Sequence, residues 1–267
     1  MKIWFFLFLL LPVSAWSRGG EFTLAAKNFP SIHLQKVRDV HVYLPPGYED
    51  KRVSEYPVLY MHDGQNLYDP KRAFMGQTWK AQETLNQLIL SKKIRPLIVV
   101  GIDNTPERTN EYTHDADQDS RHGGGSADEY LKFMTQELLP FIQKNFRVKK
   151  DRESTAIMGS SLGGLVSLYA GLKEARTFGL VGALSPSLWW NRSSILDRYR
   201  MTAVMPVRIY IDSGTAGGEK PQDVLDFVSE FETRSKIYSV IQQGATHSET
   251  YWAKRFPAAL EALFGQR

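Results

Sequence analysis

The sequence predicts one domain of the α/β class, with a mostly parallel, doubly wound sheet and helices on both faces. From Val37 onward, short apolar segments alternate with segments whose apolar residues recur at helical spacing. Most of the short segments lack polar alternation, as is typical of strands that are buried on both faces. The 267 residues show no composition shift or linker that would mark a second domain.

Seven segments are expected to form strands. The first, 40–44, alternates in polarity and ends at the turn signal Pro45-Pro46-Gly47. The others are short and apolar: 57–61, 96–102, 155–158, 178–184, 207–211 and 237–241. Because helices separate these buried strands, right-handed crossovers are expected to make them parallel.

Five segments have the apolar spacing of helices, namely 79–90, 127–146, 162–172, 224–231 and 250–263. Pro140 lies inside the longest of them and is expected to kink it. Only a short connection separates the strands 178–184 and 207–211. We therefore expect no separate lid domain.

Residues 1–15 have the pattern of a secretory signal peptide. Lys2 precedes an apolar run at 3–11, and small residues stand at the −3 and −1 positions of a cleavage site after Ala15. The run is shorter than the ~20 residues that a membrane-spanning helix needs. We expect residues 16–267 to form the folded domain, exported to the periplasm or medium, with no stable membrane insertion after cleavage.

The composition excludes several classes of protein. Hydrophobic residues make up 42% of the chain and charged residues 23%, as in globular proteins. The chain has no cysteine, which excludes disulfides, thiolate metal sites and a cysteine nucleophile. The net charge of +4 comes without a dense basic run interleaved with aromatic residues, so no nucleic-acid partner is expected.

Neither a metal nor a cofactor is expected. Asp115, Asp117 and Asp119 alternate as in a calcium loop, but Ser120 stands where that loop needs glycine. The run 123–125 is all glycine and lacks the Gly-Lys-Ser/Thr ending of a phosphate-binding loop.

The candidate nucleophile is Ser161, at the centre of a Gly-x-Ser-x-Gly motif between strand 155–158 and helix 162–172. At such a sharp turn the glycines avoid backbone collisions and the hydroxyl stands clear of the sheet edge. The first amides of the helix lack partners, so the amide of Leu162 is expected to be one oxyanion donor. The neighbouring Ser160 is out of register with both glycines.

His247 is the expected general base. A serine hydroxyl needs a base within hydrogen-bond reach, and the chain order for this motif is serine, acid, histidine. His247 follows the strand 237–241, and every other histidine precedes Ser161.

The acid is expected after strand 207–211, where several carboxylates stand. We favour Asp223, at the expected start of helix 224–231, although a residue there can also cap the helix. Asp212 and Glu219 are the main alternatives, and Asp226 is a further candidate. Asp212 precedes Ser213-Gly214 and can instead brace the turn. The acid would orient His247 and stabilise its cation.

At this point an ordered set of motifs resembles an esterase family of the α/β-hydrolase superfamily. The family includes feruloyl and acetylxylan esterases, S-formylglutathione hydrolase, siderophore esterases and mycolyltransferases. The motifs are MHDGQNLYD (61–69), GIDN (101–104), RTNEY (108–112), GSSLGG (159–164) and SPSLWW (185–190). The resemblance implies an α/β-hydrolase fold and a serine carboxylic-ester hydrolase that forms an acyl-enzyme.

The resemblance also implies a second oxyanion donor after the first core strand, and by position this is the amide of Gly64 or Gln65. Family members commonly carry the acid three to five residues past the glycine of the turn. Here the stretch 215–219 has no aspartate, a departure that leaves the acid open.

Three aromatic residues are candidates for substrate contacts. Trp189 and Trp190 follow the strand 178–184, and Tyr68 lies in the first motif. We expect a small-molecule or polymer-linked ester as substrate. An acyltransferase on the same triad, a siderophore trilactone esterase and a non-catalytic binding module are the alternatives.

Overall fold

The computed structural model describes residues 19–118 and 123–266. The predicted signal peptide, residues 1–15, lies outside the described residues. None of the helices formed by the described residues has the length and hydrophobicity needed to cross a bilayer.

One sheet of eight strands runs through the domain, in the order β1-β2-β4-β3-β5-β6-β7-β8. β1 and β2 are antiparallel to their neighbours, whereas β4, β3 and β5 to β8 are mutually parallel. This confirms the predicted mostly parallel sheet. The strands are β1 (Glu21–Ser31), β2 (Lys36–Leu44), β3 (Val58–His62), β4 (Ile98–Ile102), β5 (Thr155–Ser160), β6 (Leu180–Leu184), β7 (Arg208–Gly214) and β8 (Lys236–Gln242).

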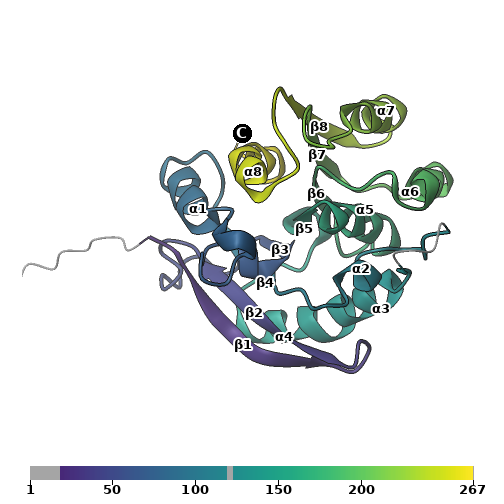
Figure 1. Cartoon of the computed structure of the whole chain (residues 1–267). Coiled ribbons are helices and arrows are strands. Elements are labelled where there is room, and N and C mark those ends of the chain that lie inside the picture. The colour runs from purple at the N-terminus through teal and green to yellow at the C-terminus, as the bar shows by residue number, and fades with distance from the viewer. Residues whose placement is uncertain (1–18, 119–122, 267) are drawn as a thin grey trace, which may run out of the picture.

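Helices cover both faces of the sheet (Figure 1). On one face α1 (Ala81–Leu90) and α8 (Glu249–Phe264) enclose an apolar core that includes Leu85 and Phe256. The core of the other face includes Leu165 and Phe227. Its helices are α3 (Ala127–Lys132), α4 (Leu139–Asn145), α5 (Leu162–Lys173), α6 (Trp190–Met201) and α7 (Pro221–Phe231).

Short helical turns complete the chain. These are η1 (Gly64–Asn66), η2 (Phe74–Gly76), α2 (Arg108–Glu111) and η4 (Arg152–Ser154). Within the described residues, the connection from β6 to β7 holds only α6 and its loops, in agreement with the absence of a lid domain.

The predicted kink at Pro140 takes the form of a π-helical segment. η3 (Phe133–Leu138) has π geometry, lies between α3 and α4 and ends two residues before the proline. Proline has no backbone N–H and interrupts the regular hydrogen bonds of an α-helix. The wider turn of the π segment lets the helix continue past this interruption.

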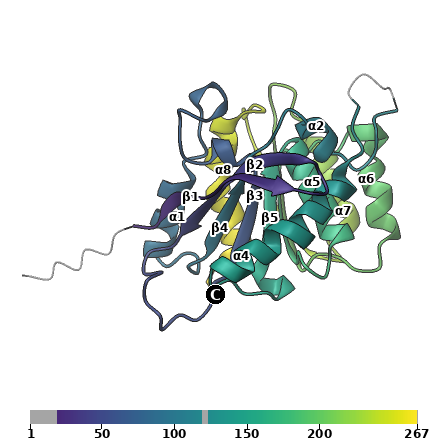
Figure 2. The ribbon, with the colours of Figure 1, turned by 90° about the horizontal axis from the view of Figure 1, so that it is seen from below.

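β1 was not predicted from the sequence. Most of its side chains are exposed or half-buried, so its hydrophobic pattern is weak. It pairs with β2 in a long hairpin at the sheet edge (Figure 2). The ring of Phe29 packs 5.1 Å from that of Phe141 on α4. The hairpin is therefore held by contacts with residues distant in sequence.

Candidate active site

Ser161 lies on the sharp turn between β5 and α5. Its backbone has φ 57° and ψ −122°, a strained conformation for a residue other than glycine. A Cβ atom on Gly159 would lie 2.8 Å from the backbone of Gly163 and 2.9 Å from the ring of His62. Glycine is therefore required for the turn to close, as the Gly-x-Ser-x-Gly motif predicts.

Ser161 is half-buried, whereas Ser160 completes β5 and is buried. Both serines line the same cavity. The amide of Ser161 donates to the carbonyl oxygen of Leu184, which ties the turn to β6. The Ser161 hydroxyl lies 3.4 Å from the hydroxyl of Ser187. In this structure the side chain is therefore paired with Ser187 and makes no hydrogen bond to His247.

His247 lies in the loop between β8 and α8, at the same edge of the sheet. Its Nδ1 atom is 3.5 Å from Oε2 of Glu219, and its side chain is 33% exposed. The edge of its ring packs on Trp252, with the ring centres 4.9 Å apart. Trp252 also lines the cavity of Ser161. One indole thus contacts the imidazole and borders the serine's cavity.

Glu219 is held in one position by buried hydroxyl groups. Ser185 Oγ donates to Oε1 at 2.6 Å and Ser213 Oγ donates to Oε2 at 3.1 Å. Burial alone would raise the pKa of Glu219, but the hydrogen bonds from His247 and Ser185 outweigh it and lower the pKa. The carboxyl group is therefore ionised and fixed beside the imidazole.

The preference for Asp223 as the triad acid is not supported. Asp223 lies in the first turn of α7, where a carboxylate favours the helix start, and no contact joins it to His247. Asp226 accepts a hydrogen bond from Gln222 on the same helix. Glu219, one of the alternatives, is the carboxylate that lies beside His247.

Asp212 braces the sheet edge, as the competing interpretation proposed. It is fully buried and accepts hydrogen bonds from the Ser185 amide at 2.9 Å and the Tyr210 hydroxyl at 3.0 Å. Nε of Arg255 on α8 lies 3.0 Å away. This carboxylate joins β6, β7 and α8.

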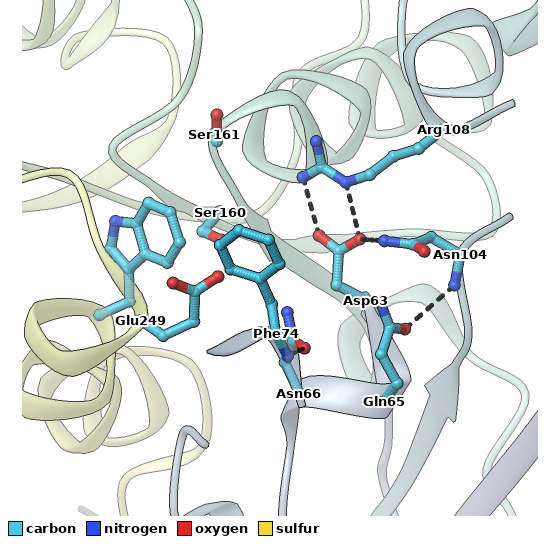
Figure 3. A pocket seen from close by; sticks show the side chains of 10 residues that line it. Asp63, Gln65, Asn66, Phe74, Asn104, Arg108, Ser160, Ser161 and Glu249 are labelled. Atoms are coloured by element: carbon cyan, nitrogen blue, oxygen red, sulfur yellow. Dashed lines mark hydrogen bonds and ion pairs between the residues drawn. The ribbon is translucent and has the colours of Figure 1, made fainter. Parts of the chain in front are cut away.

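A cavity of about 350 Å³ adjoins Ser161 (Figure 3). On one side Asp63 makes a two-point ion pair with Arg108, through Nε and Nη2 at 2.8 Å each. Asn104 donates to the same carboxylate at 2.6 Å. Burial opposes ionisation of Asp63, but Arg108 more than offsets it and lowers the pKa. Phe74 and Glu249 also line the cavity.

The predicted oxyanion donors lie at starts of helical turns. Leu162 is the first residue of α5, and Gly64 and Gln65 begin η1. The first amides of a helix have no acceptor within it, so they are free to bind an anion. A Cβ on Gly64 would lie 2.6 Å from the backbone nitrogen of Ile102, and the Gln65 side chain accepts from the Asn104 amide at 3.2 Å. The hydrogen bond thus ties η1 to the loop after β4, and the close approach of Gly64 to β4 leaves no room for a side chain there.

Comparison with known proteins identifies the family of this chain. A model of the family described as "Putative esterase" matches residues 31–263. The chain belongs to this esterase family. The uncharacterized protein YbbA of Bacillus subtilis is 28% identical, with 90% of this chain and 98% of YbbA covered. An endo-1,4-beta-xylanase/feruloyl esterase of Xylanibacter ruminicola is 28% identical over 89% of this chain.

The esterase spans only 31% of the length of the Xylanibacter ruminicola enzyme. Its fold is that of an IroE-like serine hydrolase from Shewanella oneidensis, with a TM-score of 0.73, 21% identity, and 92% of this chain and 80% of the other covered. The α/β-hydrolase fold is therefore confirmed, and family membership makes this chain a carboxylic ester hydrolase.

The aromatic residues expected to contact substrate have different environments in the esterase. Trp190 is only 2% exposed, and its Nε1 donates to the carbonyl of Asp115 at 2.9 Å, so its expected role in a cleft wall is wrong. Trp189 is 44% exposed and lines a small cavity with His247. Tyr68 lines a different cavity from that of Ser161 and bonds His41 through its hydroxyl at 2.8 Å.

Most residues of the Ser161 cavity were not predicted as site residues, among them Phe74, Arg108, Glu249 and Trp252. Arg108 lies within a motif that supported the family resemblance, but its ion pair with Asp63 crosses 45 positions and no local pattern shows it. Glu249 stands two positions after His247, and this proximity to the expected base was a usable signal.

His62 lies beneath the nucleophile turn without acting as its base. It is buried, and its Nδ1 is 2.9 Å from the hydroxyl of Tyr130. Burial lowers the pKa of His62 to about 3. It is therefore a neutral packing residue, in line with its place before Ser161 in the chain.

Among the described residues, one acidic and histidine cluster has the spacing of a metal site: Asp39, His41 and Asp103. The guanidinium of Arg72 bonds both His41 Nε2 and Asp103 Oδ2. A cation of the protein itself therefore occupies this cluster. Asp115 of the calcium-like pattern pairs with Arg198 at 2.5 Å, and Asp119 lies outside the described residues.

Proposed function

We propose that the esterase is an exported serine hydrolase in which Ser161, His247 and Glu219 form the catalytic triad. The observation that carries this proposal is the strained turn at Ser161, together with a histidine and an ionised carboxylate at the same sheet edge. Glu219 replaces Asp223 as the acid because it is the carboxylate beside His247.

The reaction begins when the Ser161 side chain turns from Ser187 toward His247. Nε2 of His247 takes the hydroxyl proton as Oγ attacks the ester carbonyl carbon. The amides of Leu162 and of Gly64 or Gln65 stabilise the negative oxygen, each typically contributing ~3 kcal/mol. His247 then protonates the leaving alcohol, and an acyl-enzyme remains.

Water completes the cycle. His247 removes its proton while the oxygen attacks the acyl carbon, and Ser161 recovers its proton as the acid leaves. Glu219 keeps Nδ1 of His247 protonated and stabilises the imidazolium that forms in each half-reaction.

The substrate is a small-molecule or polymer-linked ester. The cavity beside Ser161 has the size of a site for a small acyl group. A polymer-linked ester is supported by the relative in Xylanibacter ruminicola, whose name joins a xylanase to a feruloyl esterase. No lid domain covers the described part of the site.

Export is supported by the charge, apolar run and cleavage-site pattern of residues 1–15. We expect the full chain, expressed in a bacterial host, to appear in the periplasm or medium with Trp16 as its first residue. N-terminal sequencing of the exported protein tests this, and an uncleaved chain retained in membranes would contradict it.

The nucleophile is tested by Ser161→Ala. We expect this variant to lose hydrolysis of p-nitrophenyl acetate and labelling by a fluorophosphonate probe. Ser91→Ala, at the end of α1, is the matched control and should retain both. Full turnover by purified Ser161→Ala would refute the triad. Analysis of products with added alcohols tests acyl transfer, and we expect free acid to dominate.

A further inference from the structure

The cavity beside Ser161 carries an unbalanced negative charge. Three charged side chains line it: Asp63, Arg108 and Glu249. Arg108 is committed to Asp63 through two hydrogen bonds of 2.8 Å, so these two charges offset each other. Glu249 has no hydrogen bond or ion pair from another side chain among the described residues. Its carboxylate is therefore the charge that an entering substrate meets.

Glu249 is the first residue of α8 and follows His247 by two positions. Figure 3 shows its side chain in the cavity, on the side opposite the Asp63–Arg108 pair. A carboxylate at a helix start is common and stabilising on a surface. Here, however, burial raises the pKa of Glu249, and Asp63 raises it further, which outweighs the lowering by the residue's own backbone hydrogen bond and by Arg108 and His247. The Glu249 carboxylate therefore faces the cavity without a cationic side chain from the described part of the chain bonded to it.

From this geometry we infer that Glu249 selects substrates by charge, so that esters with neutral acyl groups are cleaved in preference to esters with anionic ones. This inference rests on the proposed function, because it assigns the cavity to the acyl part of an ester attacked by Ser161. It is opposite to what the positive net charge of the chain would suggest. The charge inside the cavity governs which substrates are preferred, because charges within a partly enclosed site are screened less than charges spread over the surface.

The test compares two p-nitrophenyl esters of similar shape. The butyrate is neutral, and the hemisuccinate has a carboxylate in place of the terminal methyl group. For the wild type we expect kcat/KM for the butyrate to exceed that for the hemisuccinate. In Glu249→Gln this ratio should fall about tenfold or more, because removing a nearby like charge favours the anion. The change should come mainly from faster cleavage of the hemisuccinate.

Two further variants control the experiment. Glu249→Asp keeps the charge and should keep most of the wild-type ratio. Glu83→Gln removes an exposed carboxylate that lines a different cavity and should leave the ratio unchanged. Thermal unfolding checks that each variant is folded.

The outcomes separate this inference from the proposed function. An unchanged ratio in Glu249→Gln overturns the inference, and so does an equal loss of activity on both esters, which would make Glu249 a support for His247. Activity retained by Ser161→Ala overturns the proposed function instead. A wild-type enzyme that cleaves the hemisuccinate as fast as the butyrate also overturns the selection by charge.

Discussion

Nδ1 of His247 lies 3.5 Å from Oε2 of Glu219, a carboxylate that stands five positions past Gly214 at the end of β7. The same carboxylate accepts hydrogen bonds from Ser185 and Ser213. Two hydroxyls, one directly after β6 and one near the end of β7, thus fix the carboxylate beside the imidazole. This relationship is why we propose Glu219 as the acid, where four carboxylates competed in the sequence.

We expect Glu219→Gln to lower kcat by about 10²-fold or more, since an amide cannot hold the imidazolium as the carboxylate does. Asp223→Asn is the matched control and should remain within about threefold of the wild type, because Asp223 lies on α7 without a contact to His247. Steady-state kinetics on p-nitrophenyl acetate measures both. The assignment fails if Asp223→Asn is the more damaging change.

Gly64→Ala tests the position of η1. The new Cβ would lie 2.6 Å from the backbone nitrogen of Ile102, so η1 must move away from β4. Displacing the proposed oxyanion donors should lower kcat at least about tenfold. Gly47→Ala, at a turn after β2, is the control: its φ of +78° makes the substitution strained, but nothing lies within 4 Å of the new Cβ, so activity should be retained. Equal activities in the two variants would argue against η1 as a donor segment.

Replacing the two tryptophans should affect stability in different ways. Trp190→Ala removes a buried indole and its hydrogen bond to Asp115, and we expect a loss of about 3–5 kcal/mol in the free energy of unfolding. Trp189→Ala removes a partly exposed ring and should cost about 1 kcal/mol or less. Urea denaturation monitored by circular dichroism measures both values. Similar losses would contradict the buried position of Trp190.

His62 should make the protein sensitive to acid. Its pKa is about 3 in the folded state and near 6.5 when unfolded, so the unfolded chain binds the extra proton between these values. Stability supplied by the neutral ring is therefore present above pH 6.5 and falls as the pH drops toward 3. The expected contribution to the slope is about 1.4 kcal/mol per pH unit.

Urea unfolding of the wild type and His62→Asn at pH 7 and pH 5 checks this expectation. The variant should lose about 2 kcal/mol less than the wild type over that interval. The pKa of His41 is also lowered by burial, to about 4, but His41 is present in both proteins and its effect cancels. Parallel pH dependences would show that His62 is not buried as a neutral group.

Local patterns were sufficient to predict the parallel strands and the sharp turn at Ser161. β3, β4, β5 and β6 are buried along their whole length, so their residues form apolar runs that are visible in the sequence. Ser161 was also predictable, because the glycines that permit its turn lie within two positions of it. The exposed strand β1 lacked such a pattern. α6 also lacked a clear pattern in the sequence, and its residues 191–193 have left-handed backbone angles.

The choice of acid shows where the sequence became insufficient. The family spacing reached position 219, but we expected an aspartate there and set the glutamate below Asp223. Glutamate has a longer side chain than aspartate, so it reaches His247 from a different backbone position. Only the packing of the loops shows which carboxylate lies beside the imidazole. The Asp63–Arg108 pair, the burial of Trp190 and the cavity position of Glu249 likewise depend on contacts between distant segments. The parallel strands, the turn at Ser161 and the residue types for ester hydrolysis were readable from the sequence, because these follow from local spacing. Which side chains meet was visible only in the folded molecule, because that depends on how separate loops pack at one sheet edge.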